Sequence, residues 1–308
     1  MAKPNSPHDL EAMQTEIIKT SFSDSFEIVP GDLPSEYARE FGASLEASVY
    51  TTIFSAIKPE ICLDIGSNIG AAALFFAQHC EQVYAFEPNP YIYPVLQRNA
   101  ERNKAGVTAF PFGLSDTASE LMFYLYPDWN TGASSFVVEN MKAVASKSVQ
   151  SISAKVEIGD EVLAEQQIHH VDFIKIDTEG YEAKVLLGLK ECIMRDKPVV
   201  ALEWNADSTR KEFREQGLLQ KFFSDYLCFG LGKSWNKCLY PTILSKIKRG
   251  ILKNVLKIER PSALQKFFFD GDYELVFFIP ERFSQVVHNF SFLPADYIPA
   301  VGHIDEGK

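Results

Sequence analysis

Apolar residues in the middle of the chain fall into short runs, and most runs are followed by a longer stretch with apolar residues at helical spacing. Short apolar runs are typical of buried strands, and the longer stretches are typical of helices that pack on a sheet. The predicted elements are strand 60–65, helix 70–79, strand 82–87, helix 90–103, strand 107–112, strand 171–177, helix 180–194, strand 198–204 and helix 208–223. This alternation predicts right-handed βαβ crossovers and a mostly parallel sheet with helices on both faces.

The two ends of this region follow other patterns. Apolar residues recur at helical spacing over 34–56, which predicts one helix. Residues 1–33 show no period and are expected to be a loosely ordered lead-in. The last two predicted strands, 226–231 and 272–279, are not separated by a helix of the strand–helix alternation. Seven strands are therefore expected, with the last pair antiparallel.

The regular alternation is interrupted twice. Residues 119–158 contain a strand, a turn-rich loop and polar sequence, and we interpret them as an inserted hairpin or flap. Residues 232–268 form a basic excursion between the last two strands. The sequence therefore predicts three parts, namely an N-terminal lead-in and helix at 1–57, a main domain at 58–280 and a C-terminal tail at 281–308.

Composition limits the classes of protein to which the chain can belong. It has 308 residues, of which 46% are apolar, and its net charge of −11 argues against general nucleic-acid binding. The N-terminus lacks the apolar segment of a secretory signal, and no apolar run approaches the roughly 20 residues of a membrane span. The five cysteines are odd in number and show no C-x-x-C spacing. A reduced cytoplasmic protein without structural zinc is expected.

The charge is unevenly distributed along the chain. Between Lys233 and Lys266 there are nine Lys and Arg residues and a single acid, Glu259. Apolar residues in this segment share one helical stripe, which fits a helix packed on the core. The same pattern fits a helix that contacts an anionic membrane surface or a phosphate-bearing acceptor, so peripheral membrane contact through 233–266 is an alternative.

One strand end carries the most informative string, Asp64-Ile65-Gly66-Ser67-Asn68-Ile69-Gly70. Glycine permits unusual turns and lets the backbone approach a ligand closely. Glu87 ends the next strand, where a carboxylate can bind both hydroxyls of a ribose. The glycine spacing differs from the Gly-x-Gly-x-x-Gly of dinucleotide sites. Together these features predict a pocket for a nucleoside with a cationic tail.

Two further strand ends carry acids. Asp177 ends the strand at 171–177 and Glu203 ends its neighbour, so their carboxylates are expected to lie close together. Such a pair either raises the pKa of one member, giving a proton acceptor, or holds a divalent cation. No histidine falls at the carboxyl end of a predicted strand, which leaves Asp177 as the candidate base. Glu179 fits substrate contact and a solvated helix start equally well.

The loop of the predicted flap contains Trp129 and Ser134 among small polar residues. An idle surface loop is one reading. The other is a lid over an acceptor, because loops beside a ligand site often carry binding residues. On the second reading Trp129, Ser134 and Glu179 contact the substrate.

Five strings between about 58 and 206 form a series. They are Leu63 to Gly70, Phe86-Glu87-Pro88-Asn89-Pro90, Phe112-Gly113-Leu114-Ser115-Asp116, Ile176-Asp177-Thr178-Glu179-Gly180-Tyr181-Glu182, and Val199 to Trp204. This series resembles the FkbM-type family of S-adenosylmethionine-dependent methyltransferases, and the string around Asp177 is its most specific part. The resemblance implies a Rossmann-like class I methyltransferase fold. It also implies methyl transfer to a hydroxyl, often on a sugar, glycan or natural product.

The resemblance also implies roles for individual residues. The Gly66 to Gly70 turn would pack against the methionine part of the cofactor, Glu87 would bind the ribose, and Asp177 would lie beside the methyl group. Asp177 and Glu203 are the candidate catalytic residues, with a metal at this pair as a weaker alternative. The full set of expected cofactor contacts is Asp64, Gly66, Ser67, Asn68, Gly70, Glu87, Pro88, Asn89, Gly113, Leu114 and Asp177.

Three other functions compete with this reading. A nicotinamide dehydrogenase would need a third glycine where this chain has Ala71. A nucleic-acid base methyltransferase would be basic overall and would carry an Asn/Asp-Pro-Pro-aromatic string in place of Ile176-Asp177-Thr178-Glu179. A non-catalytic scaffold could keep the fold and use 233–266 as a docking arm. Binding of the cofactor product would separate these readings.

Overall fold

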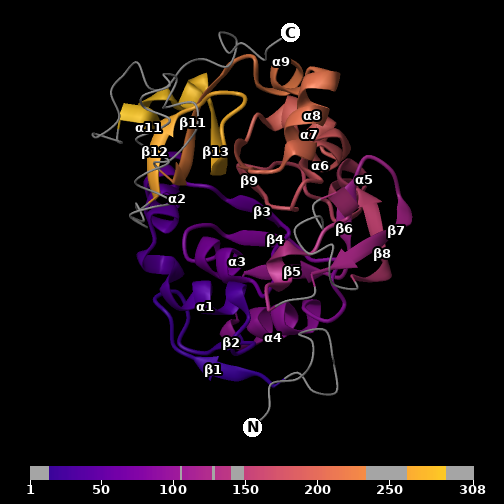
Figure 1. Ribbon diagram of the computed structural model, residues 1–308. Helices are drawn as coiled ribbons and strands as arrows, with labels where there is room; N and C mark the ends of the chain where they lie inside the picture. Colours follow the sequence, from indigo (N-terminus) through magenta and orange to yellow (C-terminus); the bar gives the residue numbers. More distant parts are fainter. Residues whose placement is uncertain (1–13, 105, 127–128, 140–148, 234–261, 289–308) are drawn as a thin grey trace, which may run out of the picture.

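The central feature of the fold is a twisted sheet with helices on both sides (Figure 1). This computed structural model describes residues 14–104, 106–126, 129–139, 149–233 and 262–288. Most of the basic segment predicted to form a helix, and with it the predicted membrane contact, lies outside these residues. Among the helices within the described ranges, none is long and apolar enough to cross a membrane.

The main sheet has eight strands in the order β12-β11-β13-β10-β9-β3-β4-β5. The five strands from β10 to β5 are parallel, as the alternating pattern predicts. The strands are β3 (Ile61–Ile65), β4 (Gln82–Phe86), β5 (Val107–Phe110), β9 (Phe173–Ile176), β10 (Val199–Trp204), β11 (Tyr226–Lys233), β12 (Ser262–Lys266) and β13 (Tyr273–Pro280). The carboxyl ends of the parallel strands lie at one edge of the sheet. The acids Asp64, Glu87, Asp177 and Glu203 were expected at this edge.

The antiparallel end of the sheet is larger than expected. Strand β13 inserts between β10 and β11 and runs antiparallel to both, which confirms the antiparallel last pair. Strand β12 then pairs with β11 and adds an eighth strand. It falls within the 232–268 excursion, which was expected only to separate the last two strands.

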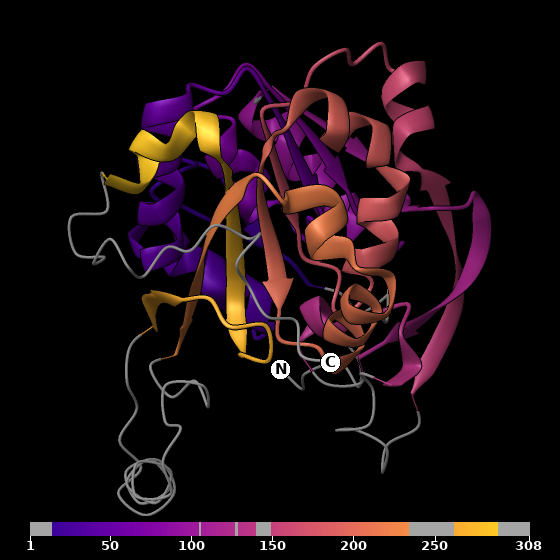
Figure 2. The same cartoon turned by 90° about the horizontal axis from the view of Figure 1, so that it is seen from above.

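Helices cover the two faces in two sets (Figure 2). Buried residues of α2, α3, α4 and α11 form one cluster with one face of the sheet, and those of α5 to α9 form the other. The helices are α1 (Leu33–Glu40), α2 (Leu45–Ile57), α3 (Ala71–Phe76), α4 (Tyr93–Asn103), α5 (Gly159–Glu165), α6 (Glu182–Gly188), α7 (Lys190–Asp196), α8 (Asp207–Gln216), α9 (Leu218–Phe223) and α11 (Ser284–His288). The fold is therefore a three-layer αβα sandwich.

Three helices expected to be continuous are each divided in two. The helix expected at 34–56 breaks between α1 and α2, where Ser44 accepts a hydrogen bond from the backbone of Ala47 and starts a new helix. The helix expected at 208–223 breaks at Gly217, which has a φ of 60°. The helix expected at 180–194 breaks after Gly188, whose backbone packs directly on the carbonyl of Ser115. Apolar spacing alone does not reveal these breaks, because both halves face the same core.

The insertion at 119–158 contains a hairpin, as predicted. Strand β7 (Ser119–Leu125) pairs antiparallel with β8 (Gln150–Ile158), and β6 (Gly113–Ser115) pairs with β8 to complete a small second sheet. In Figure 1 this sheet stands beside the carboxyl ends of the main strands, at the edge near β5.

Residues 14–33 are more ordered than the expected loose lead-in. Strands β1 (Glu16–Ile18) and β2 (Phe26–Ile28) form a hairpin, and Phe26 and Ile28 are fully buried. The buried Glu27 side chain forms ion pairs with Arg98 and Arg102 on α4. Short strands with few alternating positions leave little period in the sequence, which explains why the pattern missed them.

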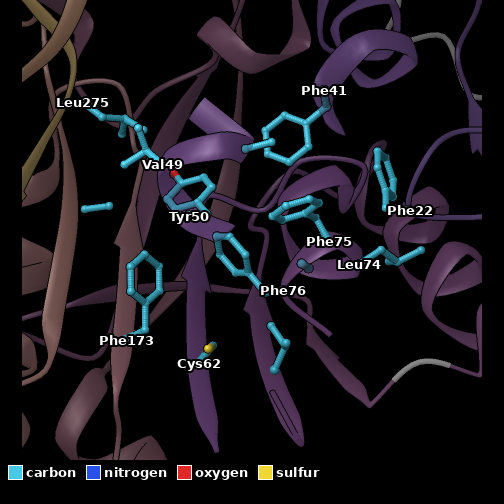
Figure 3. Packing of buried hydrophobic residues seen from close by; sticks show 14 of the residues in the cluster. Phe22, Phe41, Val49, Tyr50, Cys62, Leu74, Phe75, Phe76, Phe173 and Leu275 are labelled. Carbon is cyan, nitrogen blue, oxygen red and sulfur yellow. The ribbon is translucent and has the colours of Figure 1, made fainter. Parts of the chain in front are cut away.

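Aromatic rings join the N-terminal helices to the sheet (Figure 3). Tyr50 of α2 lies within ring-contact range of Phe76 on α3 and Phe173 on β9, with centroids 4.9 and 5.7 Å apart. Phe41 contacts Phe75 in the same way. Edge-to-face contacts of this kind add to the stabilisation that burial provides, so residues 41–54 are part of the main core.

The first prediction concerns Asn99, a buried residue of α4. Its side chain accepts from the Glu27 amide and donates to the carbonyls of Glu27 and Ile69. Asn99→Ala leaves buried backbone groups without partners and is expected to lower the free energy of unfolding by about 2–4 kcal/mol. Urea denaturation measures this change. Gln97→Ala on the exposed side of α4 is the control and is expected to stay within about 0.5 kcal/mol. Equal effects of the two substitutions would contradict this role.

Candidate active site

A tight turn follows β3 and brings three loops together. Gly66 has a φ of 83°, and a Cβ atom there would lie 1.8 Å from the carbonyl oxygen of Asp177. The amides of Gly66 and Ser67 donate to the carbonyl of Phe86, at the end of β4. Only glycine allows so close an approach between these strands. The turn therefore packs against both neighbouring strand ends.

Glu87 is fixed by the backbone at the end of β4. Its Oε2 accepts from the Asn68 amide at 2.9 Å, and its Oε1 accepts from the Asn89 amide at 2.8 Å. Burial raises the pKa of Glu87 to about 7, although both backbone hydrogen bonds oppose that effect. Each carboxylate oxygen can accept a further hydrogen bond, so the group can bind two hydroxyls in a fixed orientation.

Asp64 lies below the turn and is fully buried. Its two carboxylate oxygens have no hydrogen-bond donor within the described residues, while Ser67 Oγ donates to its backbone carbonyl. Burial raises the pKa of Asp64, and the positive charge of Lys175 opposes the shift. A buried carboxylate without donors is costly unless a cation lies near it.

That cation is Lys175 of β9, which is 6% exposed. Its Nζ donates to Asp177 Oδ2 at 2.7 Å. Burial lowers the pKa of Lys175, but the negative charges of Asp177, Asp64 and Glu46 outweigh burial, so that the net shift is upward. Lys175 therefore stays charged and stabilises the acids around it.

Three carboxylates meet at the ends of β9 and β10. Oxygen atoms of Asp177, Glu179 and Glu203 lie within 4.8 Å of one another. Glu203 accepts from the Glu179 amide and from Asn205 Nδ2. Burial and the charge of Asp177 raise the pKa of Glu179 to about 8, and burial raises the pKa of Glu203 well above its usual value. The structure thus brings Asp177 and Glu203 together, as the sequence predicts.

The trio has the donor atoms that a divalent cation would use. Two of its three carboxylates already accept hydrogen bonds, however, because Lys175 donates to Asp177 and two N–H groups donate to Glu203. The raised pKa of Glu203 also means that protonation relieves the like charges. Metal binding at Asp177 and Glu203 therefore stays a prediction.

Glu182 supports the loop between β9 and α6. Its Oε1 accepts from the Thr178 amide, the Thr178 hydroxyl and the Gly180 amide. Thr209 on α8 donates to Oε2. Glu182 thus caps the turn that positions Asp177 and Glu179.

The flap is linked to the N-terminal segment and to the glycine turn. The amide and hydroxyl of Thr131 both donate to the buried carboxylate of Asp32 at 2.9 Å. Asn68 Nδ2 donates to Thr131 Oγ1 at 3.2 Å.

Two further hydrogen bonds hold the flap. The Leu33 amide donates to the carbonyl of Trp129, and Ser135 Oγ donates to the carbonyl of Glu179. The flap is therefore fixed over the strand ends.

These segments enclose a cavity of about 420 Å³. Its walls come from α1, α2, the glycine turn, the ends of β4 and β9, β6 and the flap. The lining residues predicted as cofactor or substrate contacts are Gly66, Ser67, Asn68, Glu87, Pro88, Gly113, Leu114, Ser134, Asp177 and Glu179. A single cavity therefore joins the expected nucleoside contacts to part of the expected acceptor contacts.

Five predicted contacts do not line this cavity. The Trp129 side chain packs against the hydrophobic core, and its carbonyl binds Leu33, so it is part of the support of the flap. Asp64, Gly70, Asn89 and Glu203 lie behind the wall and hold the residues that line it. Strand-end position is visible in sequence, but the direction of each side chain is not.

The lining residues that the sequence did not predict include Tyr37, Glu46 and Lys175. Tyr37 and Glu46 lie on α1 and α2. The spacing of apolar residues in this region was used only to predict a helix, so it did not indicate a role in the site for either residue. Lys175 stands inside an apolar run, between Ile174 and Ile176. A charged residue at a buried strand position was the available signal, because such residues are rarely buried without a partner.

Known proteins resemble this chain in the part that carries the site. The family described as the methyltransferase FkbM domain matches residues 64–227. Over 138 residues the chain is 29% identical to hexuronic acid methyltransferase AglP of Haloferax volcanii, which covers 45% of this chain and 53% of that protein. Over 158 residues it is 28% identical to the 31-O-demethyl-FK506 methyltransferase FkbM of Streptomyces tacrolimicus, covering 43% and 60%. The chain thus spans less than two thirds of the length of either relative.

A solved structure gives a weaker likeness. The crystal structure of methyltransferase FkbM from Methylobacillus flagellatus KT covers 72% of this chain and 44% of that chain. The TM-score is 0.43 and the sequence identity is 16%.

The second prediction concerns the hydroxyl of Thr131. Thr131→Val keeps the shape of the side chain but removes the donor to Asp32 and the acceptor for Asn68. We expect the free energy of unfolding to fall by about 1–3 kcal/mol, because a buried carboxylate loses a partner. Thr131→Ser keeps the hydroxyl and should retain most of the stability. Chemical denaturation compares the two variants, and a loss as large in the serine variant would exclude the hydroxyl as the cause.

Proposed function

This chain belongs to the FkbM methyltransferase family, and we propose that it transfers a methyl group from its cofactor S-adenosylmethionine to a hydroxyl of a sugar, glycan or natural product. The observation that carries the proposal is the position of Glu87. Its carboxylate is fixed by two backbone amides at the wall of a cavity that also contains the glycine turn and Asp177.

The residues that line the cavity suit the chemistry of the cofactor. Gly113 and Leu114 line it where adenine is proposed to bind, and a Cβ atom at Gly113 would lie 3.2 Å from the Phe136 ring. Glu87 can accept the two ribose hydroxyls. Further carboxylates lie on the other side of Glu87 from Gly113, and Asp177 is the one nearest the glycine turn. Their negative charge favours a sulfonium cation over a pyrophosphate. These features support S-adenosylmethionine against the dinucleotide of a dehydrogenase.

The acceptor is proposed to lie under the flap. Ser134 and Phe136 of the flap line the cavity together with Glu179 and Tyr181 from the β9 loop. Polar and aromatic side chains in one wall suit a molecule that has both hydroxyls and apolar surface. The names of two relatives specify hexuronic acid and 31-O-demethyl-FK506, which supports a hydroxyl-bearing small molecule.

The reaction requires alignment and the removal of one proton. S-adenosylmethionine supplies an electrophilic methyl group on a sulfonium. The acceptor oxygen forms a bond to the methyl carbon as the bond from carbon to sulfur breaks, which leaves a methyl ether and S-adenosylhomocysteine. We assign Asp177 to orient the hydroxyl and accept its proton, with Lys175 fixing the carboxylate and Glu203 positioning the neighbouring backbone through the Glu179 amide. Holding the reactants about 3 Å apart supplies much of the catalysis.

Methyl transfer itself tests the proposal. Labelled S-adenosylmethionine is incubated with the protein and a panel of hydroxyl compounds, including simple glycosides and glucuronides, and methyl ethers are identified by mass spectrometry. Asp177→Asn is expected to keep S-adenosylhomocysteine affinity while lowering turnover by about 10²–10⁴-fold. Full turnover in this variant would remove Asp177 from the mechanism. A protein that fails to bind S-adenosylhomocysteine would favour the scaffold alternative.

A pH prediction follows from Glu87. Because ribose hydroxyls donate to the ionised carboxylate, binding should weaken as the pH falls through its pKa of about 7. The probe is 5′-methylthioadenosine, which has adenosine and a thioether but no amino acid group. Its affinity at pH about 6 should be roughly tenfold lower than at pH about 8.

Calorimetry at several pH values measures this dependence. Glu87→Gln should bind weakly throughout and lose the step near pH 7. Asp64 and Asp177 also influence Glu87, so the variant is needed to assign the effect. A step of unchanged size in Glu87→Gln would show that another group titrates.

A further inference from the structure

The wall formed by the N-terminal helices contains a carboxylate that the proposed chemistry does not use. Glu46 of α2 lines the cavity, although it lies outside the residues 64–227 that match the family. The hydroxyls of Tyr37 and Tyr50 donate to its two carboxylate oxygens at 2.7 and 2.8 Å. The carboxylate is held in one orientation, and it can still accept further hydrogen bonds, because a carboxylate has about four acceptor sites.

Lys175 faces Glu46 from the sheet. Tyr50 of α2 packs against Phe173 of β9, with ring centroids 5.7 Å apart. Glu46 lies one helical turn before Tyr50, and Lys175 lies two residues after Phe173 on the same face of the strand. Burial lowers the pKa of Lys175, and the nearby carboxylates, Glu46 among them, outweigh that effect. Burial raises the pKa of Glu46, and the charge of Lys175 opposes that shift, so this part of the wall carries an acid and a base that interact electrostatically.

The strand order places this charged pair beyond the ribose site. Gly113 and Leu114 lie on β6, next to the β5 edge, and Glu87 ends β4. Strands β3 and β9 follow in the sheet. A nucleoside with its adenine at Gly113 and its ribose at Glu87 directs its 5′ substituent towards β9, where Lys175 and Glu46 line the cavity. Neighbouring opposite charges suit a zwitterionic amino acid group, through charge-assisted hydrogen bonds.

We propose that Glu46 binds the α-ammonium group of the methionine tail of S-adenosylmethionine, while Lys175 faces the carboxylate of that tail. The inference rests on the proposed function, since it assumes the cofactor orientation set by Glu87. It gives the N-terminal helices a direct part in cofactor binding. The family-matched segment then supplies the contacts to the nucleoside, and α2 supplies a contact to the tail.

Calorimetry with two ligands and the full chain tests the assignment. S-adenosylhomocysteine has the amino acid tail, and 5′-methylthioadenosine lacks it. Glu46→Gln is expected to weaken S-adenosylhomocysteine binding by about 30-fold or more, as expected for loss of a buried charge pair. Its affinity for 5′-methylthioadenosine should change by less than about twofold. Glu40→Gln, an exposed acid of α1, is the control for a general charge effect and should change neither affinity.

Tyr37→Phe provides a second, milder variant that does not depend on the folding of Glu46→Gln. It removes one hydroxyl donor to Glu46 and should weaken S-adenosylhomocysteine binding by a few fold without affecting 5′-methylthioadenosine. Equal losses for both ligands, or no loss for S-adenosylhomocysteine, would overturn the inference and leave the proposed function intact. A wild-type protein that binds neither ligand would instead overturn the proposed function together with this inference.

Discussion

The ammonium group of Lys175 holds the acidic end of the cavity together. It is buried on β9, donates to Asp177, and interacts with the charges of Asp64 and Glu46. Carboxylates that lose their hydration at such short range repel one another, and without a cation they would take up protons or separate. The alternation of β9 directs Lys175 to this face, while Ile174 and Ile176 pack into the opposite cluster. The site therefore depends on one charged residue in an otherwise apolar strand.

The second constraint is the contact between the N-terminal segment and the family-matched segment. Asp32 holds Thr131, which contacts Asn68, and the Asn68 amide holds Glu87. A path of hydrogen bonds thus runs from the start of α1 through the flap to the carboxylate of Glu87. Buried networks of this kind fix geometry well because each member would be costly to leave unpaired. The flap and the glycine turn are consequently positioned relative to each other before any ligand binds.

Sequence pattern predicted the parallel part of the sheet well, because β3, β4, β5, β9 and β10 are short and mostly apolar runs. It did not predict β12 or the hairpin of β1 and β2, whose few alternating positions carry little period. Glycines and acids at strand ends revealed Gly66, Glu87 and Asp177. Trp129 was misassigned because a loop sequence does not show which way a side chain points. Glu46 was missed because its role requires Lys175, which is about 130 residues away in the chain and adjacent only after folding.

The carboxylates at the ends of β9 and β10 differ enough in their surroundings to suit separate roles. Glu203 lies behind the wall with its oxygens occupied by N–H groups, and burial raises its pKa, so it suits support of the loop. Asp177 lines the cavity and is oriented by Lys175. On the proposed function, the cavity would lose a positive charge on methyl transfer, and the acceptor hydroxyl would become more acidic as its oxygen is alkylated. Proton transfer to Asp177 would then be easiest late in the reaction, so that a carboxylate could serve where histidine is absent from the described cavity wall.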